Sequence, residues 1–472
     1  MEKPFKSMRS WVIFFICTIF VTPTFSQPGS NDLTFNPGTG ANREIFSSAI
    51  QSDGKILIAG NFTSYNGVAR NYLARLNTDG SLDAAFNAGP GPNSAILKIA
   101  LESNGKIIIA GGFTQYNFIP VPYILRLNSD GTIGSLNVGW GPNSSIRSTA
   151  IQADGKIIVV GPFTTFNSEA RKDIARLNVD GTIDASFNSG TGTNSSITTV
   201  ALQSDGKIII GGSFTTYNGT VVNKIARLNS DGTLDASFTG TGANSTVLST
   251  SIQPDGKIII VGIFNSYNGT AAYGIARLNI NGTIDASFTT GTGAINSVIS
   301  AIAIQSDGKI IIGGDFMAYN GTAINRIARL NTNGTIDAGF NPGTGANSSI
   351  QTISNQSDGK IIIGGYFYLY DGTSREMVAR VNGNGVSSST NYFRTIFSGN
   401  WNNASTWESA TSSSFTTGLV SPATLSPDLN ANTITIRNGH TITVNANVAV
   451  DQLVINPGSS VIIQTSVFFT VL

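Results

Sequence analysis

The charged side chains of this chain recur at fixed positions, which makes them the first candidates for chemistry. One series of arginines is Arg75, Arg126, Arg176, Arg227, Arg277, Arg329 and Arg380. A matching series of aspartates is Asp32, Asp83, Asp184, Asp235, Asp285 and Asp337, interrupted by Gly134. These groups could form a ring of charged ligands, but a role needed once per molecule does not require seven copies. We therefore predict structural ion pairs, such as Arg227 with Asp235, whose loss would leave a charge unpaired.

Few residues are available for catalysis or for metal binding. His440 is the only histidine, and the only cysteine, Cys17, lies in an N-terminal apolar run. A serine triad, a thiolate site and a multi-histidine metal site are therefore not expected. Stretches such as 229–235 resemble calcium loops only superficially, because no glutamate follows at the required spacing. We predict no catalytic residue, no cofactor and no metal site.

Loops in which one copy departs from the others are better candidates for ligand binding. The segment 117–123 replaces the usual Asn-Gly-Thr turn with an apolar, proline-containing stretch, and Trp140 replaces a small residue. The candidate ligand loop is therefore Phe118, Tyr123 and Trp140, since aromatic side chains on loops stack on sugar rings or peptide side chains. Drift of a single copy remains the alternative explanation.

These residues belong to a repeat of about 50 residues. Seven Asx-Gly-Lys turns begin at Asp53, Asn104, Asp154, Asp205, Asp255, Asp307 and Asp358, in steps of 51, 50, 51, 50, 52 and 51 residues. One unit contains four apolar runs, at 198–203, 207–212, 225–229 and 233–238, separated by turn residues. No segment has sustained helical periodicity. The pattern predicts an all-β fold, with each unit a four-stranded blade of a seven-bladed β-propeller; a parallel β-helix, with shorter rungs, is the rival.

The two ends of the repeat region predict how the ring closes. The last unit stops at Gly385 without its fourth strand, whereas residues 32–40 match a fourth strand that has no preceding third strand. We expect this N-terminal strand to complete the last blade, with Asp32 beside Arg380. The propeller is then assigned to residues 27–385.

The repeated signature, S-D-G-K-I-I-I-G-G-x-F followed by I-A-R-L-N-x-D-G-T-I-D-A-S-F, resembles the bacterial delta-60 repeat family. The resemblance covers residues 31–385. It implies β-propeller blades and an exported context, but no activity.

A second module follows the repeats. Residues 386–397 are typical of a linker, and residues 398–472 contain short alternating strands and the sequence G-N-W-x-x-x-x-T-W at 399–407. This segment resembles the opening rungs of right-handed β-helices in exported bacterial proteins. Because the chain ends on an apolar strand, 468–472, we expect a small, partial β-helix-like module that continues in a longer protein.

The N-terminus and the charge balance indicate the compartment. Lys3, Lys6 and Arg9 precede a short apolar run, 11–21, which predicts a signal peptide over residues 1–26. Without it, 25 basic and 26 acidic side chains remain, dispersed through the repeats. We therefore expect no nucleic-acid partner, and no membrane insertion after signal cleavage. The predicted location is extracellular or on a bacterial cell surface.

These observations favour a secreted, non-catalytic binding or scaffold protein, monomeric, whose propeller loops face a glycan or a protein. The alternative is an extracellular carbohydrate-active enzyme, either a glycoside hydrolase or a lyase. A structural spacer is the third hypothesis.

Overall fold

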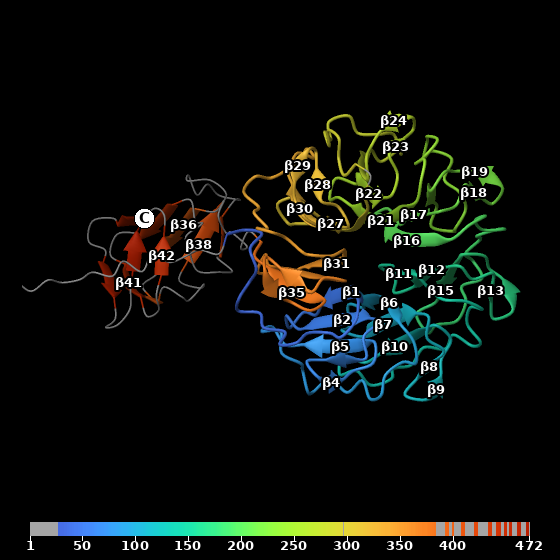
Figure 1. Ribbon diagram of the computed structural model, residues 1–472, viewed down its shortest axis with the longest axis horizontal. Coiled ribbons are helices and arrows are strands. Elements are labelled where there is room, and N and C mark those ends of the chain that lie inside the picture. The colour runs from blue at the N-terminus through green and yellow to red at the C-terminus, as the bar shows by residue number, and fades with distance from the viewer. Residues whose placement is uncertain are drawn as a thin grey trace, which may run out of the picture.

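The computed structural model describes residues 27–295 and 297–383, together with short segments between residues 392 and 471. Seven similar blades form a closed ring (Figure 1), and the described residues contain strands and no helix. The predicted all-β, seven-bladed propeller is confirmed. The predicted signal peptide lies outside the described residues, as does most of the predicted linker, so the predicted domain boundaries stay predictions.

Each blade contains one three-stranded antiparallel sheet. The first strands of the seven sheets, called here the inner strands, are β1 (Ile45–Ile50), β6 (Ile96–Leu101), β11 (Ser148–Ile151), β16 (Ile197–Leu202), β21 (Val247–Ile252), β26 (Ile299–Ile304) and β31 (Ile350–Asn355). The middle strands are β2 (Ile56–Gly60), β7 (Ile107–Gly111), β12 (Ile157–Val160), β17 (Ile208–Gly212), β22 (Ile258–Gly262), β27 (Ile310–Gly314) and β32 (Ile361–Gly365). The third strands are β5 (Leu73–Leu76), β10 (Ile124–Leu127), β15 (Ile174–Leu177), β20 (Ile225–Leu228), β25 (Ile275–Leu278), β30 (Ile327–Leu330) and β35 (Val378–Val381).

The fourth run of each unit does not form a full strand, so that part of the prediction is wrong. Of the run 233–238, only Leu234 pairs, through a single bridge to Leu228. The chain then turns because the Asp235 carboxylate accepts hydrogen bonds from the backbone N–H and the hydroxyl of Ser237, at 3.0 and 2.7 Å. An aspartate side chain that binds the backbone two residues later replaces the ladder bonds a strand would make.

Each blade also carries a short outer hairpin at the rim (Figure 1), which the sequence reasoning treated only as a turn. The hairpins are β3–β4 (Ser64–Tyr65, Val68–Ala69), β8–β9 (Gln115–Tyr116, Ile119–Pro120), β13–β14 (Thr165–Phe166, Glu169–Ala170), β18–β19 (Thr216–Tyr217, Thr220–Val221), β23–β24 (Ser266–Tyr267, Thr270–Ala271), β28–β29 (Ala318–Tyr319, Thr322–Ala323) and β33–β34 (Leu369–Tyr370, Thr373–Ser374).

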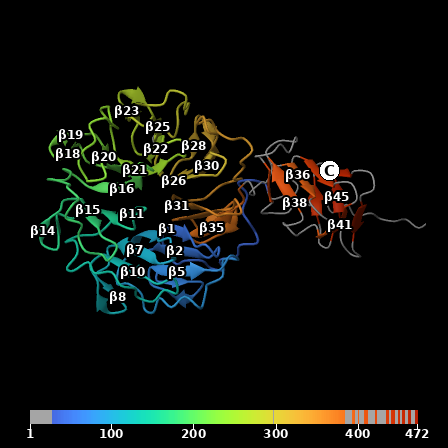
Figure 2. The same cartoon turned by 180° about the vertical axis from the view of Figure 1, so that it is seen from behind.

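The N-terminal segment closes the ring as predicted. The Asp32 backbone N–H donates to the carbonyl of Arg380 at 2.8 Å, and Asn31 forms a bridge with Val381. The inner strands β1 and β31 are neighbours (Figure 2), and Ser48 Oγ lies 3.0 Å from Thr352 Oγ1 across this joint. The first described residues therefore complete the seventh blade.

The core is divided among the joints between blades. One apolar cluster combines Leu57 and Leu73 of the first blade with Ile96 and Ile107 of the second, and the cluster at the closing joint combines Ile45 with Ile362. The middle strands are buried on both faces because each blade lies between two others. Burial on both faces explains why these strands are continuous apolar runs and do not alternate.

The C-terminal segments form both parallel and antiparallel pairs, the antiparallel ones lying between residues 392 and 422. The strands are β36 (Tyr392–Thr395), β37 (Gly399–Asn400), β38 (Trp407–Ala410), β39 (Val420–Pro422), β40 (Thr433–Ile436), β41 (Thr441–Val444), β42 (Val448–Val450), β43 (Leu453–Ile455), β44 (Ser460–Ile463) and β45 (Phe469–Val471). Strands β36, β40 and β43 pair in parallel, and so do β37, β41 and β44.

Candidate functional site

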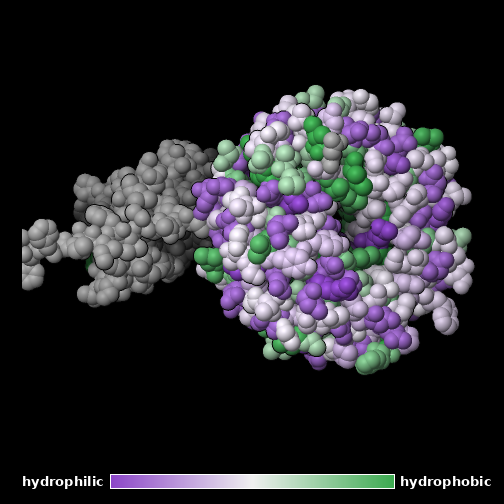
Figure 3. Space-filling view, viewed as in Figure 1, coloured by the Kyte–Doolittle hydropathy of each residue, from purple (hydrophilic) through white to green (hydrophobic). Residues whose placement is uncertain are grey.

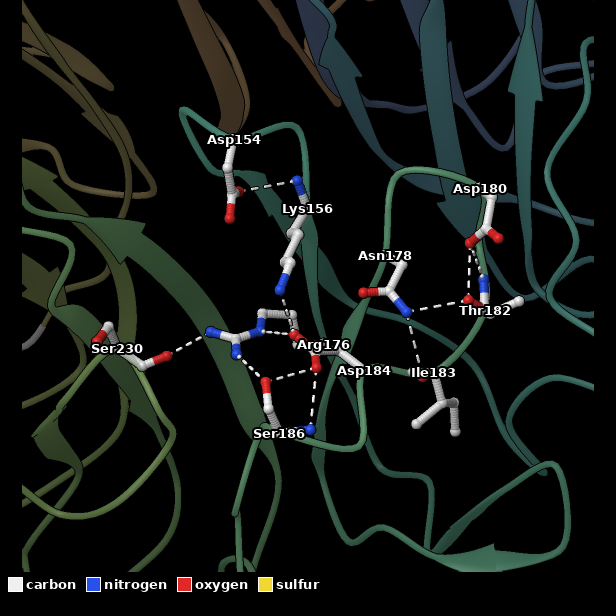
Figure 4. Close-up of polar contacts among 10 residues, drawn as sticks. All are labelled: Asp154, Lys156, Arg176, Asn178, Asp180, Thr182, Ile183, Asp184, Ser186 and Ser230. Atoms are coloured by element: carbon white, nitrogen blue, oxygen red, sulfur yellow. Dashed lines mark hydrogen bonds and ion pairs between the residues drawn. The ribbon is translucent and has the colours of Figure 1, made fainter.

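The recurring charges meet in one Lys–Asp–Arg cluster per blade, and Figure 4 shows the cluster of the third blade. Asp184 Oδ2 accepts from Arg176 Nε at 2.7 Å and from Lys156 Nζ at 2.8 Å. The arginine also donates to Ser186 Oγ of its own blade and, through Nη1, to the carbonyl of Ser230 in the next blade. The cluster therefore links three parts of the chain and two blades.

This arrangement recurs almost unchanged around the ring. The six complete clusters are Lys55–Asp83–Arg75, Lys156–Asp184–Arg176, Lys207–Asp235–Arg227, Lys257–Asp285–Arg277, Lys309–Asp337–Arg329 and Lys360–Asp32–Arg380. In each of these blades the guanidinium also lies over a phenylalanine ring; for Arg227 and Phe238 the distance to the ring centroid is 5.1 Å. Arg380 donates to the carbonyl of Thr78, so the same link spans the closing joint.

The aspartates of these clusters are held in their charged form. Burial by itself raises the pKa of Asp83, but hydrogen bonds from Lys55, from the backbone N–H of Ala85 and from Arg75 outweigh it, and the pKa falls to about 2. The pKa of Asp32 is likewise about 2, because bonds from Lys360, Thr34 and Arg380 outweigh burial. A carboxylate so firmly ionised and so fully bonded is poorly suited to proton transfer.

The second blade replaces the missing aspartate in a different way. Gly134 occupies the aspartate position, and Arg126 instead pairs with Glu102, whose Oε1 lies 2.7 Å from Arg126 Nη2. The other six blades have glutamine where this blade has Glu102, at Gln51, Gln152, Gln203, Gln253, Gln305 and Gln356. That single departure from the repeat was the signal that could have revealed the compensation.

Among the candidate loop residues, Phe118 has an unusual backbone. It lies at the tip of the β8–β9 hairpin with φ +65°, a left-handed conformation, and its side chain is 81% exposed. Five other blades have glycine there, for example Gly67 with φ +74° and Gly219 with φ +78°. Only glycine adopts this conformation without steric cost, so Phe118 is strained, as is Ser168 with φ +64° at the same position of the third blade.

Phe118 borders a shallow groove between the first and second blades. The groove has a volume of about 270 Å³ and is lined by Asn71, Tyr72, Pro90, Gly91, Pro92, Asn93, Gln115 and Phe118. None of these residues is charged, and they combine apolar rings with side-chain amides. The groove can therefore offer stacking and hydrogen bonding to a neutral, polar ligand.

The other two candidate residues occupy different environments. Trp140 is 88% exposed and stands at the position that Pro90 holds beside the groove, but one blade further along. Tyr123 is partly buried and packs against the apolar cluster between the second and third blades. The structure thus presents Phe118 and Trp140 to solvent and places Tyr123 in a joint.

The last blade exposes further aromatic residues that the sequence reasoning missed. Tyr366 and Tyr368 follow β32 and are both exposed, and the Tyr366 ring lies 6.1 Å from the ring of Phe46 in the first blade. Blades two to four have Gly112, Pro162 and Ser213 where this blade has Tyr366. Aligning the seven copies at this position would have revealed it.

The described part of the chain holds no group of three or more histidine, cysteine, aspartate or glutamate residues that could bind a metal ion. It also has no helix long and apolar enough to cross a membrane.

Solved structures with similar folds are distant. The WD40 β-propeller domain of Doa1 is 14% identical, with a TM-score of 0.47 over 74% of this chain and 95% of that one. An extracellular domain from B. thetaiotaomicron is 16% identical, with a TM-score of 0.49 over 78% of this chain, which spans only 43% of that domain. Virginiamycin B lyase from Staphylococcus aureus is 15% identical, with a TM-score of 0.46 over 73% and 96%. These likenesses carry no conclusion about activity.

A comparison with curated protein sequences found no match. A family model described as a β-propeller domain of unknown function, DUF5122, matches seven segments, at residues 51–86, 102–133, 152–187, 203–238, 253–288, 305–340 and 356–386. Each segment spans the middle strand, the outer hairpin and the third strand of one blade, and together the segments cover just over half of the chain. The chain therefore belongs to the DUF5122 β-propeller family.

Proposed function

We propose that this protein is an exported, non-catalytic binding protein whose outer hairpins and adjoining loops bind a neutral glycan. The observation that carries the proposal is Phe118, an exposed aromatic ring held in a strained conformation beside an uncharged groove. Non-glycine residues held in sparsely populated backbone conformations cluster at functional sites. Amide side chains next to an aromatic ring suit the hydroxyl groups and the apolar face of a sugar.

The test is calorimetric titration of the full chain with neutral oligosaccharides, namely cello-, xylo- and manno-oligosaccharides. Two variants restore the residue found in other blades, Phe118→Gly and Trp140→Thr. We expect each variant to weaken binding about tenfold, a loss of roughly 1.4 kcal/mol. Val221→Thr, which changes an exposed side chain on the hairpin of the fourth blade, is the matched control and keeps full affinity.

Assays of the same mixtures for product ends, and binding assays with proteins, separate the alternatives. New reducing or unsaturated ends, abolished by a single carboxylate substitution, would replace this proposal with a carbohydrate-active enzyme. Binding to proteins but to no oligosaccharide would assign the surface to a protein partner. Absence of any ligand would favour a structural spacer.

The proposal also includes export of the protein through a cleaved signal peptide and a C-terminal β-helix-like module. Cleavage before Gln27 would release a mature, monomeric chain, and N-terminal sequencing of secreted protein checks this point. The delta-60 resemblance supports a bacterial extracellular or cell-surface location. The parallel strand pairs of the C-terminal segments are of the kind that β-helix rungs make, which supports a β-helix-like module.

A further inference from the structure

The inner strands surround the middle of the ring (Figure 1), and the face drawn in Figure 3 is hollowed there. Their side chains are almost all apolar, hydroxylated or amides, and Lys98 in β6 is the only ionisable residue among the seven strands. The equivalent residues of the other blades are Ser47, Ser148, Thr199, Ser249, Ala301 and Thr352. Lys98 is therefore the single charge within these strands, and the exposed Arg147 directly precedes β11.

In three joints, at Ser47, Thr199 and Thr352, a hydroxyl at this position bonds to the inner strand of the next blade. Thr352 Oγ1 accepts from the backbone N–H of Ser48 at 3.1 Å, and Ser47 Oγ accepts from the backbone N–H of Ile99 at 3.0 Å. A lysine ammonium has only donors and cannot accept such a bond. The substitution therefore removes an acceptor that the preceding joint keeps at Ser47.

The residue that faces this position from the third blade is Thr149 in β11, which is equivalent to Ser48, Ile99 and Thr250. Thr149 is only 4% exposed, and its hydroxyl Oγ1 is buried with no hydrogen-bond partner within the described chain. Buried hydroxyls are almost always bonded in folded proteins. An unsatisfied hydroxyl and an unusual lysine thus belong to adjacent inner strands.

The Lys98 ammonium makes no hydrogen bond or ion pair with the described residues that surround it. The acids closest in sequence to the inner strands are already engaged, because Glu102 pairs with Arg126 and Glu44 accepts from Asn61. Burial lowers the pKa of Lys98, and no carboxylate offsets that effect. Lys98 is itself partly exposed, so a counter-charge from outside the inner strands can reach its ammonium.

We propose that Lys98 and Thr149 bind the carboxylate group of a ligand in the middle of the ring. The ammonium donates a charge-assisted hydrogen bond to one carboxylate oxygen, and the Thr149 hydroxyl donates to the other. One lysine balances the single charge of a carboxylate, whereas a doubly charged phosphate or sulfate would keep an excess negative charge among the inner strands. This site is separate from the groove at Phe118 and does not depend on glycan binding there.

The first experiment measures thermal shifts and calorimetric binding of the full chain with carboxylate probes. Glucuronate is compared with glucose, and N-acetylglycine with its amide, which distinguishes an acidic sugar from a peptide C-terminus as the source of the carboxylate. We expect a rise in melting temperature with at least one carboxylate and with neither neutral analogue. The rise disappears in Lys98→Met and persists in Lys106→Met, a matched charge removal in the same blade.

Equal stabilisation by chloride would overturn the assignment to a carboxylate, as would the absence of any Lys98-dependent shift. A second measurement needs no ligand. Lys98→Ser restores the residue of other blades, removes an unpaired charge and provides an acceptor for the third blade, so its melting temperature should rise. A fall in melting temperature would mean that Lys98 serves the fold, and the proposal would then be wrong.

Discussion

The Lys–Asp–Arg clusters and the outer hairpins occur in the same blades but vary to very different degrees. Six clusters share the same Lys–Asp–Arg ion pairs, whereas the hairpin tips range from Asn66-Gly67 to Asn117-Phe118 and Asp371-Gly372. In five of the six clusters the arginine also bonds to the next blade, and Arg329 is the exception. Replacing a cluster residue therefore leaves a buried partner unpaired. A hairpin tip faces solvent, where a new side chain disturbs little.

The second blade sharpens this contrast because it departs from the repeat in both regions. Its cluster has Gly134 where the other six blades have aspartate, and Glu102 supplies the carboxylate instead, so the change is compensated. Its hairpin gained Phe118 in a left-handed conformation, and nothing in the blade offsets the strain. Compensated changes preserve the fold, whereas uncompensated ones are where a binding function is best sought.

Acid should have the largest effect, because it acts on all the clusters at once. The folded-state pKa of Asp32 and Asp83 is about 2, below the ordinary 3.8, and that of the other four cluster aspartates is also lowered. A lowered acid pKa stabilises the fold above about pH 4, and this contribution is lost as the pH falls towards 2. Urea unfolding at pH 5 and pH 2.5 should show a large drop in midpoint. An unchanged midpoint would contradict the structural role of the clusters.

Arg227→Ala should cost about 3–5 kcal/mol, since it leaves Asp235 buried without its arginine. Urea unfolding at pH 7 measures the change. Arg43→Ala, at an exposed arginine, is the control and should stay within about 0.5 kcal/mol of the parent. If the two substitutions lowered the free energy of unfolding equally, the cluster arginine would be no more important for stability than an exposed one.

Glu102→Gln should cost about 3 kcal/mol, because Arg126 then loses the carboxylate that replaces the missing aspartate. Adding Gly134→Asp restores the carboxylate at the position used by the other six blades. The double variant should recover more than half of the loss in urea unfolding. Without such recovery, the account of compensation in the second blade fails.

Asp173→Asn should stabilise the fold at pH 7 by roughly 1–3 kcal/mol. Asp173 follows the outer hairpin of the third blade and is 4% exposed, and its carboxylate accepts a hydrogen bond from the Thr193 hydroxyl at 2.7 Å. Burial raises the pKa of Asp173 to about 6, because the hydrogen bond from Thr193 lowers the pKa by less than burial raises it. A raised acid pKa adds stability below about pH 4 that is lost as the pH rises through 6. The gain should therefore shrink to near zero at pH 4, and a gain independent of pH would contradict the assignment.

Phe118→Gly should have the smallest effect, a gain of about 1 kcal/mol, because glycine removes the left-handed strain. Chemical unfolding at pH 7 measures it, and Ser168→Gly at the next hairpin tests the same position with a smaller side chain. A loss of stability in Phe118→Gly would show that the ring packs usefully in its own blade, and the contrast between the two regions would weaken.

Much of the fold was predictable because the repeat supplies the same evidence seven times. The even spacing of the turns and the unmatched strands at the two ends predicted both the number of blades and the partner of Asp32. The fourth strand was predicted wrongly, since a run such as 233–238 has strand composition but Asp235 uses its carboxylate to turn the backbone. The amino-acid composition of the run does not show whether the aspartate side chain or a neighbouring strand will bond to the backbone N–H groups.

The candidate site was predictable only in part. Departures from the repeat identified Phe118 and Trp140, because an exposed loop changes without altering anything else in the sequence. The part played by Glu102 depends on which residues of its own blade come within bonding distance, and the unsatisfied hydroxyl of Thr149 depends on the neighbouring blade. Contacts of that kind link residues about 25 to 50 positions apart.

The sequence by itself determined the repeat, the number of blades and the recurring pairs of charges, because local turn chemistry and apolar runs act within a few residues. Only the tertiary structure decided which charges are shared between blades, that Tyr123 lies in a joint while Phe118 stays exposed, and that Lys98 stands alone among the inner strands. The reason is physical: burial and pairing depend on the neighbouring blade, and a linear pattern contains no record of the distance between side chains.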